Sequence, residues 1–334
     1  MAYTRKLQKI GESLFVSLPK TWTERMQLNK GDSIVLIEQP DSVVIHPRVG
    51  LKSDKIKQII LDVDIEESIR SLKRRITGAY VDGFDVIKLR AVDKFTVEQR
   101  DIIRERTKSL FGLEIIEIKS DLIGIQCLMT KMLPIESTIQ KVHGIIKPMF
   151  SEVISALRDR NPKAVKSVIE RTQDVHRLSL VLHRLLRSVI LFPTERTLEL
   201  KPIDSVDFLR VVNKITEVST SMKKIVESVA MWDPLSPDSI LESLLVIFDE
   251  ILESYEWSMQ ALMSKNVPLA NRTLDKKLDL KFDALWESLI NAEENVEISA
   301  PTFSHIHRII DNLKQIHTYT LETAEIAIDR AEEP

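Results

Sequence analysis

Residues 5–22 read RKLQKIGESLFVSLPKTW, and residues 28–47 read LNKGDSIVLIEQPDSVVIHP. The first stretch has two short strand-like runs on either side of Gly11, and a proline then introduces a helix-sized segment. The second has apolar, β-branched runs on both sides of a Pro-Asp-Ser turn, which is typical of a hairpin. A unit this small cannot bury a core alone, so we expect it to dimerise by sharing strands.

This N-terminal pattern resembles the AbrB (SpoVT/AbrB-type) swapped-hairpin DNA-binding domain. The matching features are a basic first strand, the glycine turn, the Val-Ser-Leu-Pro-Lys-x-Trp step at residues 16–22 and the Leu-x-Lys-Gly-Asp turn at residues 28–32. The resemblance implies a homodimer, formed through residues 1–50, that contacts double-stranded DNA. Basic side chains would contact phosphates, and a serine would donate hydrogen bonds. The candidate DNA-binding residues are Arg5, Lys6, Lys9, Ser13 and Lys20.

Charge is distributed unevenly along the chain. The 334 residues carry a formal net charge of −3, so the molecule as a whole is not a general polyanion binder. Residues 1–30, however, hold six Lys or Arg against two acids. This balance suits docking on phosphates at one end only. Glu12, directly after the turn glycine, favours the opposite interpretation, in which the N-terminal unit only holds two chains together.

The sequence also indicates a compartment. Cys127 is the only cysteine, which excludes an intramolecular disulfide or a thiolate metal cage and fits a reducing cytosol. The N-terminus has no signal-peptide pattern, and no apolar run approaches the length of a membrane span. We therefore expect a cytoplasmic protein without membrane insertion.

Residues 51–130 predict a small α/β layer domain in the order β-α-β-α-β-β. Strands are expected at 59–63, 86–90, 115–118 and 123–128, and helices are expected near 64–82 and 96–112. The segment contains no glycine-rich phosphate loop and no catalytic constellation, so the sequence does not favour an enzyme. It suggests no role for this domain.

From Met132 onward the apolar residues recur with helical periodicity, and prolines separate the periodic segments. We expect a six-helix domain over 131–330, which makes the chain a multidomain α+β protein. The expected helices are 134–160, 162–192, 203–230, 236–265, 267–298 and 302–330. A shift of 105 residues places Asn161 on Asn266 and Ala156-Leu157 on Ala261-Leu262. This indicates two three-helix repeats, at about 131–231 and 236–330.

The helical part resembles the PhoU fold, two three-helix repeats with acidic Glu/Asp-x-x-x-Asp motifs. On a continuous helix, two carboxylates four residues apart share one face and repel each other, and a bound cation would reverse that cost. Hard oxygen ligands suit Mg²⁺, Mn²⁺, Ca²⁺ or iron. In the family, acids on the third helix complete the sites. The candidate metal ligands are Glu170, Asp174, Glu217, Asp275 and Asp279. The alternative is that these motifs are solvated acidic helix faces.

Together the two resemblances point to archaeal AbrB–PhoU-type phosphate uptake regulators. They imply a dimeric DNA-binding transcription regulator of phosphate uptake or a related ion-homeostasis response. Its PhoU-like helices would sense a metal, an anion or a partner protein. The alternative is a signalling adaptor of a phosphate transport system. It would bind a transporter or another regulator and use the N-terminal unit only to dimerise.

Overall fold

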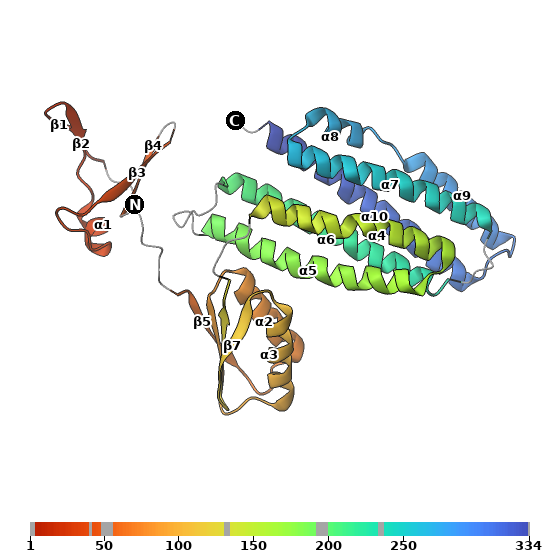
Figure 1. Ribbon diagram of the computed structural model, residues 1–334, viewed down its shortest axis with the longest axis horizontal. Helices are drawn as coiled ribbons and strands as arrows, with labels where there is room; N and C mark the ends of the chain where they lie inside the picture. The colour runs from red at the N-terminus through yellow and green to blue at the C-terminus, as the bar shows by residue number, and fades with distance from the viewer. Residues whose placement is uncertain are drawn as a thin grey trace. The chain divides into compact units, whose positions relative to one another are not determined.

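The computed structural model describes residues 4–39, 42–47, 56–129, 134–191, 200–232 and 237–332 (Figure 1). The chain divides into two compact units, Met1–Lys55 and Ile56–Pro334. The expected boundary near residue 130 separates two hydrophobic cores, but it does not separate two compact units.

The first unit consists of two hairpins and one short helix. Strands β1 (Gln8–Ile10) and β2 (Ser13–Phe15) pair antiparallel, α1 (Lys20–Arg25) follows, and β3 (Ile34–Gln39) pairs antiparallel with β4 (Ser42–Pro47). Gly11 begins the first turn with φ +65, a conformation that favours glycine. The predicted order of strand, turn, strand, helix and hairpin is confirmed.

Within this unit, none of the side chains whose exposure is described is buried. The apolar side chains of Leu7, Ile10 and Leu14 are 64%, 59% and 66% exposed. The two hairpins form two separate two-stranded sheets, and an isolated two-stranded hairpin is at best marginally stable in water. The unit therefore has strand structure, but its side chains of described exposure form no hydrophobic core.

The second unit begins with the predicted β-α-β-α-β-β domain. Its elements are β5 (Gln58–Val63), α2 (Ile69–Val81), β6 (Val86–Ala91), α3 (Val97–Ser109), β7 (Leu113–Ile118) and β8 (Leu122–Cys127). The sheet order is β5-β6-β8-β7, with β5 and β6 parallel and the other neighbours antiparallel. Alternate residues of β6 (Ile87, Leu89, Ala91) are buried in one core with residues of α2 and α3, which lie on one side of the sheet (Figure 1). Helix α2 begins after Ser68, whose hydroxyl accepts from the Ser71 amide.

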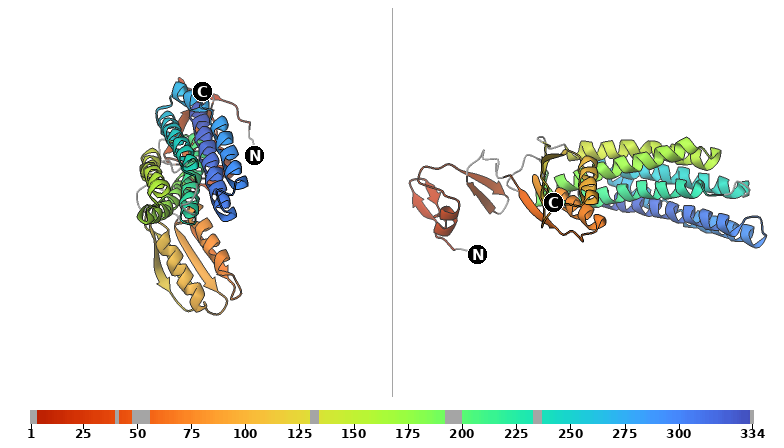
Figure 2. Two further views of the ribbon diagram at one scale, coloured as in Figure 1. Left: turned by 90° about the vertical axis from the view of Figure 1, so that its right-hand side faces the viewer. Right: turned by 90° about the horizontal axis from the view of Figure 1, so that it is seen from below.

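The rest of the unit is helical, and its long helices run side by side (Figure 2). The helices are α4 (Ile135–Asp159), α5 (Pro162–Leu191), α6 (Pro202–Val229), α7 (Asp238–Ser264), α8 (Val267–Leu274), α9 (Asp279–Glu294) and α10 (Ala300–Ala331). Helix α10 packs against both α6 and α7, and α5 packs against both α4 and α6. Among the described residues, we found no helix with the length and apolar character needed to cross a membrane.

Five of the six predicted helices are confirmed to within two residues at each end, but the prediction of one continuous helix over 267–298 is wrong. The chain leaves the helix after Leu274 and resumes at Asp279. Ala270 and Thr273 are buried, so an unbroken helix would turn Lys277 toward the core. The break buries Leu278 instead and leaves Lys277 exposed, which avoids the cost of burying an ammonium group.

The 105-residue repeat is visible in the backbone. Helices α4 and α7 end at Arg160 and Lys265, which both adopt the left-handed conformation, with φ 53 and 51. In each case an asparagine follows, Asn161 or Asn266, and its side-chain oxygen accepts from a backbone amide of the next helix. The two halves therefore share the same first turn, although their second helices differ.

Candidate functional site

The structure places the candidate DNA-binding residues on the first hairpin and its flanks. Lys9 lies on β1 opposite Leu14, and Ser13 begins β2 opposite Ile10. Arg5 and Lys6 precede β1 and are exposed. These four side chains come from one short stretch around a tight turn, so the hairpin gathers basic and hydroxyl groups on a solvent-exposed element.

Lys20 begins α1 and is close to the carboxylate of Glu24, with Nζ 3.7 Å from Oε1. Both side chains are largely exposed, and exposed ion pairs of this kind contribute about 0–1 kcal/mol. Glu12 is exposed in the turn after Gly11. The N-terminal unit therefore carries weakly engaged positive groups together with one carboxylate at the tip of the hairpin.

The first acidic motif is on the surface of α5. Glu170 and Asp174 are both exposed, and Glu170 lies 3.7 Å from the ammonium of Lys166 on the same helix. Glu217 is exposed on α6. Burial and then the charge of Glu217 raise the pKa of Tyr319 on α10, which indicates that this carboxylate lies near the junction of α6 and α10.

The second acidic motif does not have the geometry that the sequence predicted. Asp275 is the C-cap of α8 and Asp279 is the first residue of α9, so they do not lie one turn apart on one helix. The neighbouring Lys276 forms an ion pair with Glu253, with Nζ 2.6 Å from Oε2. Burial lowers the pKa of His317, and the charge of Asp279 opposes that effect. Asp279 and Lys276 therefore both lie near His317.

No group of three or more His, Cys, Asp or Glu side chains in the described parts of the chain comes together in a way that could hold a metal ion. The exposed, separated carboxylates therefore do not fit a site for Mg²⁺, Mn²⁺, Ca²⁺ or iron, which needs several converging oxygen ligands. Metal binding by these five acids stays a prediction of the sequence pattern, and the geometry does not support it.

An arginine that the sequence did not single out joins the helical part to the α/β part. Arg184 on α5 is only 7% exposed. Its Nη1 donates to the backbone oxygens of Tyr80 at 2.6 Å and Phe84 at 3.0 Å, and its Nη2 donates to that of Gly83 at 3.3 Å. One turn further along, Arg187 forms an exposed ion pair with Asp82 at 2.6 Å.

Other contacts strengthen this junction. The Arg184 guanidinium lies 5.2 Å from the centre of the Tyr80 ring, and Leu180 of α5 packs against the α/β core. Burial raises the pKa of Tyr80 to about 12, so its hydroxyl stays neutral and donates to the backbone oxygen of Phe111. Through α5, the fold therefore anchors the α/β domain on the first three-helix repeat.

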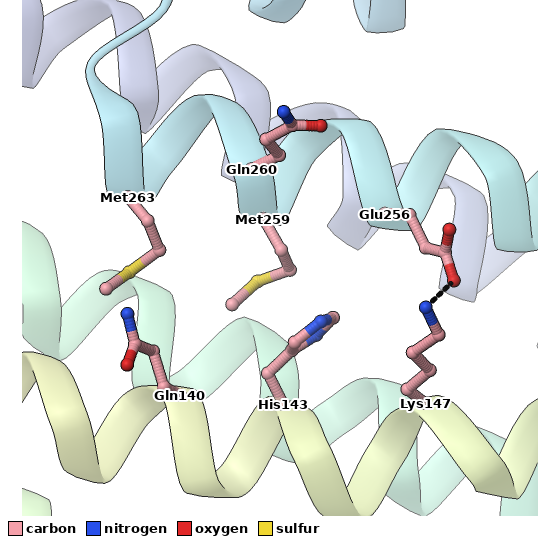
Figure 3. A pocket seen from close by; sticks show the side chains of 7 residues that line it. All are labelled: Gln140, His143, Lys147, Glu256, Met259, Gln260 and Met263. Carbon is pink, nitrogen blue, oxygen red and sulfur yellow. Dashed lines mark ion pairs between the residues drawn. The ribbon is translucent and has the colours of Figure 1, made fainter.

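A groove opens between α4 and α7, and Figure 3 shows the side chains that line it. It has a volume of about 310 Å³ and is lined by Gln140, His143, Lys147, Glu256, Met259, Gln260 and Met263. The ammonium of Lys147 and the carboxylate of Glu256 pair at 2.8 Å (Figure 3). Nδ1 of His143 lies 3.3 Å from the hydroxyl of the buried Tyr255, and burial lowers the pKa of His143. No sequence motif pointed to this groove.

Comparison with known families agrees with both resemblances. Residues 7–52 match the family described as antidote-toxin recognition MazE, bacterial antitoxin. Residues 139–229 match the PhoU domain, and this range covers α4, α5 and α6 almost completely. No curated protein gives a significant match to the chain.

The chain therefore joins a MazE/AbrB-like N-terminal domain to a PhoU-like helical domain, as the motifs predicted. The second repeat, which the break between α8 and α9 divides into four helices (α7 to α10), lies outside the range that matches the PhoU domain. Both matched families are non-enzymatic, and their combination is that of a regulator or a phosphate-related adaptor.

Proposed function

We propose that this chain is a DNA-binding regulator that works as a homodimer through its N-terminal unit. The observation that carries the proposal is the combination of secondary structure, charge and exposure in residues 4–47. Two hairpins and a helix are formed, yet their described apolar side chains remain exposed or half-buried. A second copy that exchanges or pairs strands would cover them and supply the missing core.

The same unit carries the charge that DNA binding needs. Arg5, Lys6 and Lys9 lie close together in sequence, on and before β1, and Lys20 begins α1. Contacts between such side chains and phosphates provide affinity and register, whereas sequence preference requires contacts with base edges. In a two-fold dimer this set is duplicated, so one duplex would meet two copies of the basic hairpin.

In this proposal the PhoU-like helices form the sensing part. Helices α6 and α10 belong to different repeats, and polar pairs connect them, including Arg210 with Asp329 at 2.9 Å and Ser221 with Gln315 at 3.4 Å. A ligand or partner protein that changed the packing of the repeats would shift α5. Because α5 carries Arg184, the shift would reach the α/β domain. Phosphate uptake or a related ion-homeostasis response is the process that the PhoU match favours.

A salt titration of DNA affinity tests the proposal. We expect Lys9→Ala to weaken binding to all duplex sequences, because a phosphate contact does not read the base sequence. In a dimer each substitution removes two phosphate contacts, so the slope of log K against log salt falls in magnitude by about 1.8, against about 0.9 for one contact. Fluorescence anisotropy of a labelled duplex at four or more salt concentrations measures this slope.

Lys141→Ala is the matched control, because Lys141 is an exposed lysine on α4, in the other compact unit. It should leave both the affinity and the slope unchanged. If Lys9→Ala and Lys141→Ala have equal effects, the basic hairpin is not the DNA-binding surface.

The second candidate function is a signalling adaptor that does not bind DNA. The observation that favours it is Glu12, an exposed carboxylate at the tip of the hairpin that would face the phosphates. The description of the matched N-terminal family names toxin recognition, which is a contact between proteins. A chain that is dimeric by light scattering but has no affinity for duplex DNA at low salt would support the adaptor.

A further inference from the structure

Ring contacts between α4 and α7 correspond to one another under the 105-residue shift that relates the two helical repeats. Under the 105-residue shift, Phe150 of α4 is equivalent to Tyr255 of α7, and these two rings contact each other with centroids 5.2 Å apart. His143 is equivalent to Phe248. The contact of His143 with Tyr255 at 5.5 Å is therefore the counterpart of the contact of Phe150 with Phe248 at 5.4 Å.

The two counterparts differ in chemistry. On one side, two phenylalanines fill the core, and both are fully buried. On the other side, the histidine and the tyrosine form a polar pair, and the histidine opens onto the groove between α4 and α7. Because two phenylalanines fill the equivalent position, packing alone does not require a histidine and a tyrosine here. The polar pair therefore suggests a role other than packing.

The side chains opposite His143 indicate what this role is. Met259 and Met263 are one turn apart on α7, and both extend into the groove toward α4 (Figure 3). The equivalent positions of the first repeat are Ile154 and Arg158, which have no thioether. Thioether sulfur is a soft ligand that prefers soft metal ions such as Cu(I), and imidazole nitrogen also binds copper. The side of the α4–α7 contact that carries the histidine therefore also carries two soft sulfur atoms, whereas the side with the two phenylalanines has neither.

We propose that this groove binds a soft monovalent metal ion of the Cu(I) class through Nε2 of His143 and the sulfur atoms of Met259 and Met263. Tyr255 would orient the imidazole. Its hydroxyl engages Nδ1 at 3.3 Å and leaves Nε2 for the metal, the kind of outer contact that histidine ligands usually have. The three ligands are neutral, which suits a monovalent ion.

The charges around the groove do not oppose this assignment. Lys147 and Glu256 lie in the same groove and pair at 2.8 Å, so the ammonium is compensated by a carboxylate. Methionine is flexible enough to bring its sulfur to a metal without moving the helix.

Silver tests the site, because Ag(I) is a soft monovalent ion that is not oxidised by air. The full-length chain would be labelled at its methionine methyl groups and titrated with silver nitrate in chloride-free buffer. Of the nine methionine signals, those of Met259 and Met263 should shift together, and the others should stay in place. Cys127 is a free thiol that takes its own equivalent of silver, so the titration runs to two equivalents.

Two variants locate the site. His143→Phe installs the residue that already occupies the equivalent position of the other repeat, so it should fold, and it should weaken silver binding at the methionines at least tenfold. Met231→Leu removes an exposed methionine elsewhere and should change nothing. If the Met259 and Met263 signals stay in place at two equivalents, or if His143→Phe leaves their titration unchanged, the proposal is wrong.

Discussion

Replacing Arg184 with methionine removes the charged anchor between α5 and the α/β domain but keeps most of the aliphatic volume. The guanidinium donates to three backbone oxygens, two of them at 3.0 Å or less. Of these three oxygens, only that of Tyr80 has a backbone donor besides this arginine among the described contacts, namely the amide of Gly83. The substitution therefore removes a buried charge network and leaves at least one carbonyl without its partner.

The magnitude follows from these contacts. A hydrogen bond to a charged group contributes about 1.5–3 kcal/mol, and breaking a buried charged contact typically costs about 3–5 kcal/mol. Because the bonds share one guanidinium and are not additive, we expect Arg184→Met to cost about 3–5 kcal/mol in total. Arg187→Met is the matched control one turn away. It removes an ion pair whose side chains are 44% and 46% exposed, and such a pair contributes about 1 kcal/mol or less.

Native-state hydrogen exchange of the full-length chain, read by mass spectrometry, measures the two costs in the same region. A loss of about 3 kcal/mol corresponds to a fall of more than a hundredfold in the protection of α2 and the following loop, whereas about 1 kcal/mol corresponds to roughly fivefold. We expect a fall of more than a hundredfold for Arg184→Met and of roughly fivefold for Arg187→Met. The protection of α10 should change little in either variant. Equal effects of the two variants in α2 would refute the assignment of Arg184 as the anchor.

Three further predictions concern assembly, pH and backbone conformation. Leu14→Asp should convert a dimer into a monomer in light scattering, whereas Asp at Val92, which is exposed in the other unit, should not; a dimeric Leu14→Asp variant would argue against a shared apolar surface. Burial lowers the pKa of four histidines below the usual value of 6.5, so below that pH the unfolded chain binds more protons than the folded one and urea midpoints should fall between pH 7 and pH 5. The four are His143, His176, His183 and His317. His143→Phe should reduce the dependence of the urea midpoint on pH. A midpoint that stays constant or rises on acidification would contradict this prediction. Gly112→Ala should cost about 1–2 kcal/mol in urea unfolding, because Gly112 has φ +77 and an added Cβ would lie 3.3 Å from Cβ of Met129; an unchanged midpoint would show that the loop relaxes freely.

Local sequence signals predicted most of the fold because most elements have strong boundaries. Prolines and asparagines mark the ends of α4, α5 and α7, and alternation of apolar residues marks the strands of the α/β domain. The break between α8 and α9 was missed because prediction followed the overall periodicity of 267–298. The signal was Lys277, a charged residue at a position where that periodicity requires an apolar one.

The candidate sites depended more on tertiary contacts and were harder to predict. Arg184 lies in an apolar stretch of α5, and its partners are about a hundred residues earlier, so no local pattern reveals the anchor. The acidic motifs are a local pattern, but whether the two acids of a motif share one helix face depends on helix continuity, which fails between Asp275 and Asp279. His143 was detectable in principle, because the 105-residue shift aligns it with a phenylalanine.

If residues 1–55 bind DNA as a dimer, a chain that lacks them should lose its affinity for duplex DNA. The remaining chain, Ile56–Pro334, is a compact unit with its own hydrophobic cores. Anisotropy of a labelled duplex, including the upstream region of the gene itself, would be measured with the full-length chain and the deletion at several salt concentrations. We predict salt-dependent binding by the full-length chain and none by the deletion. Equal binding by both chains, or none by either at low salt, would contradict the account.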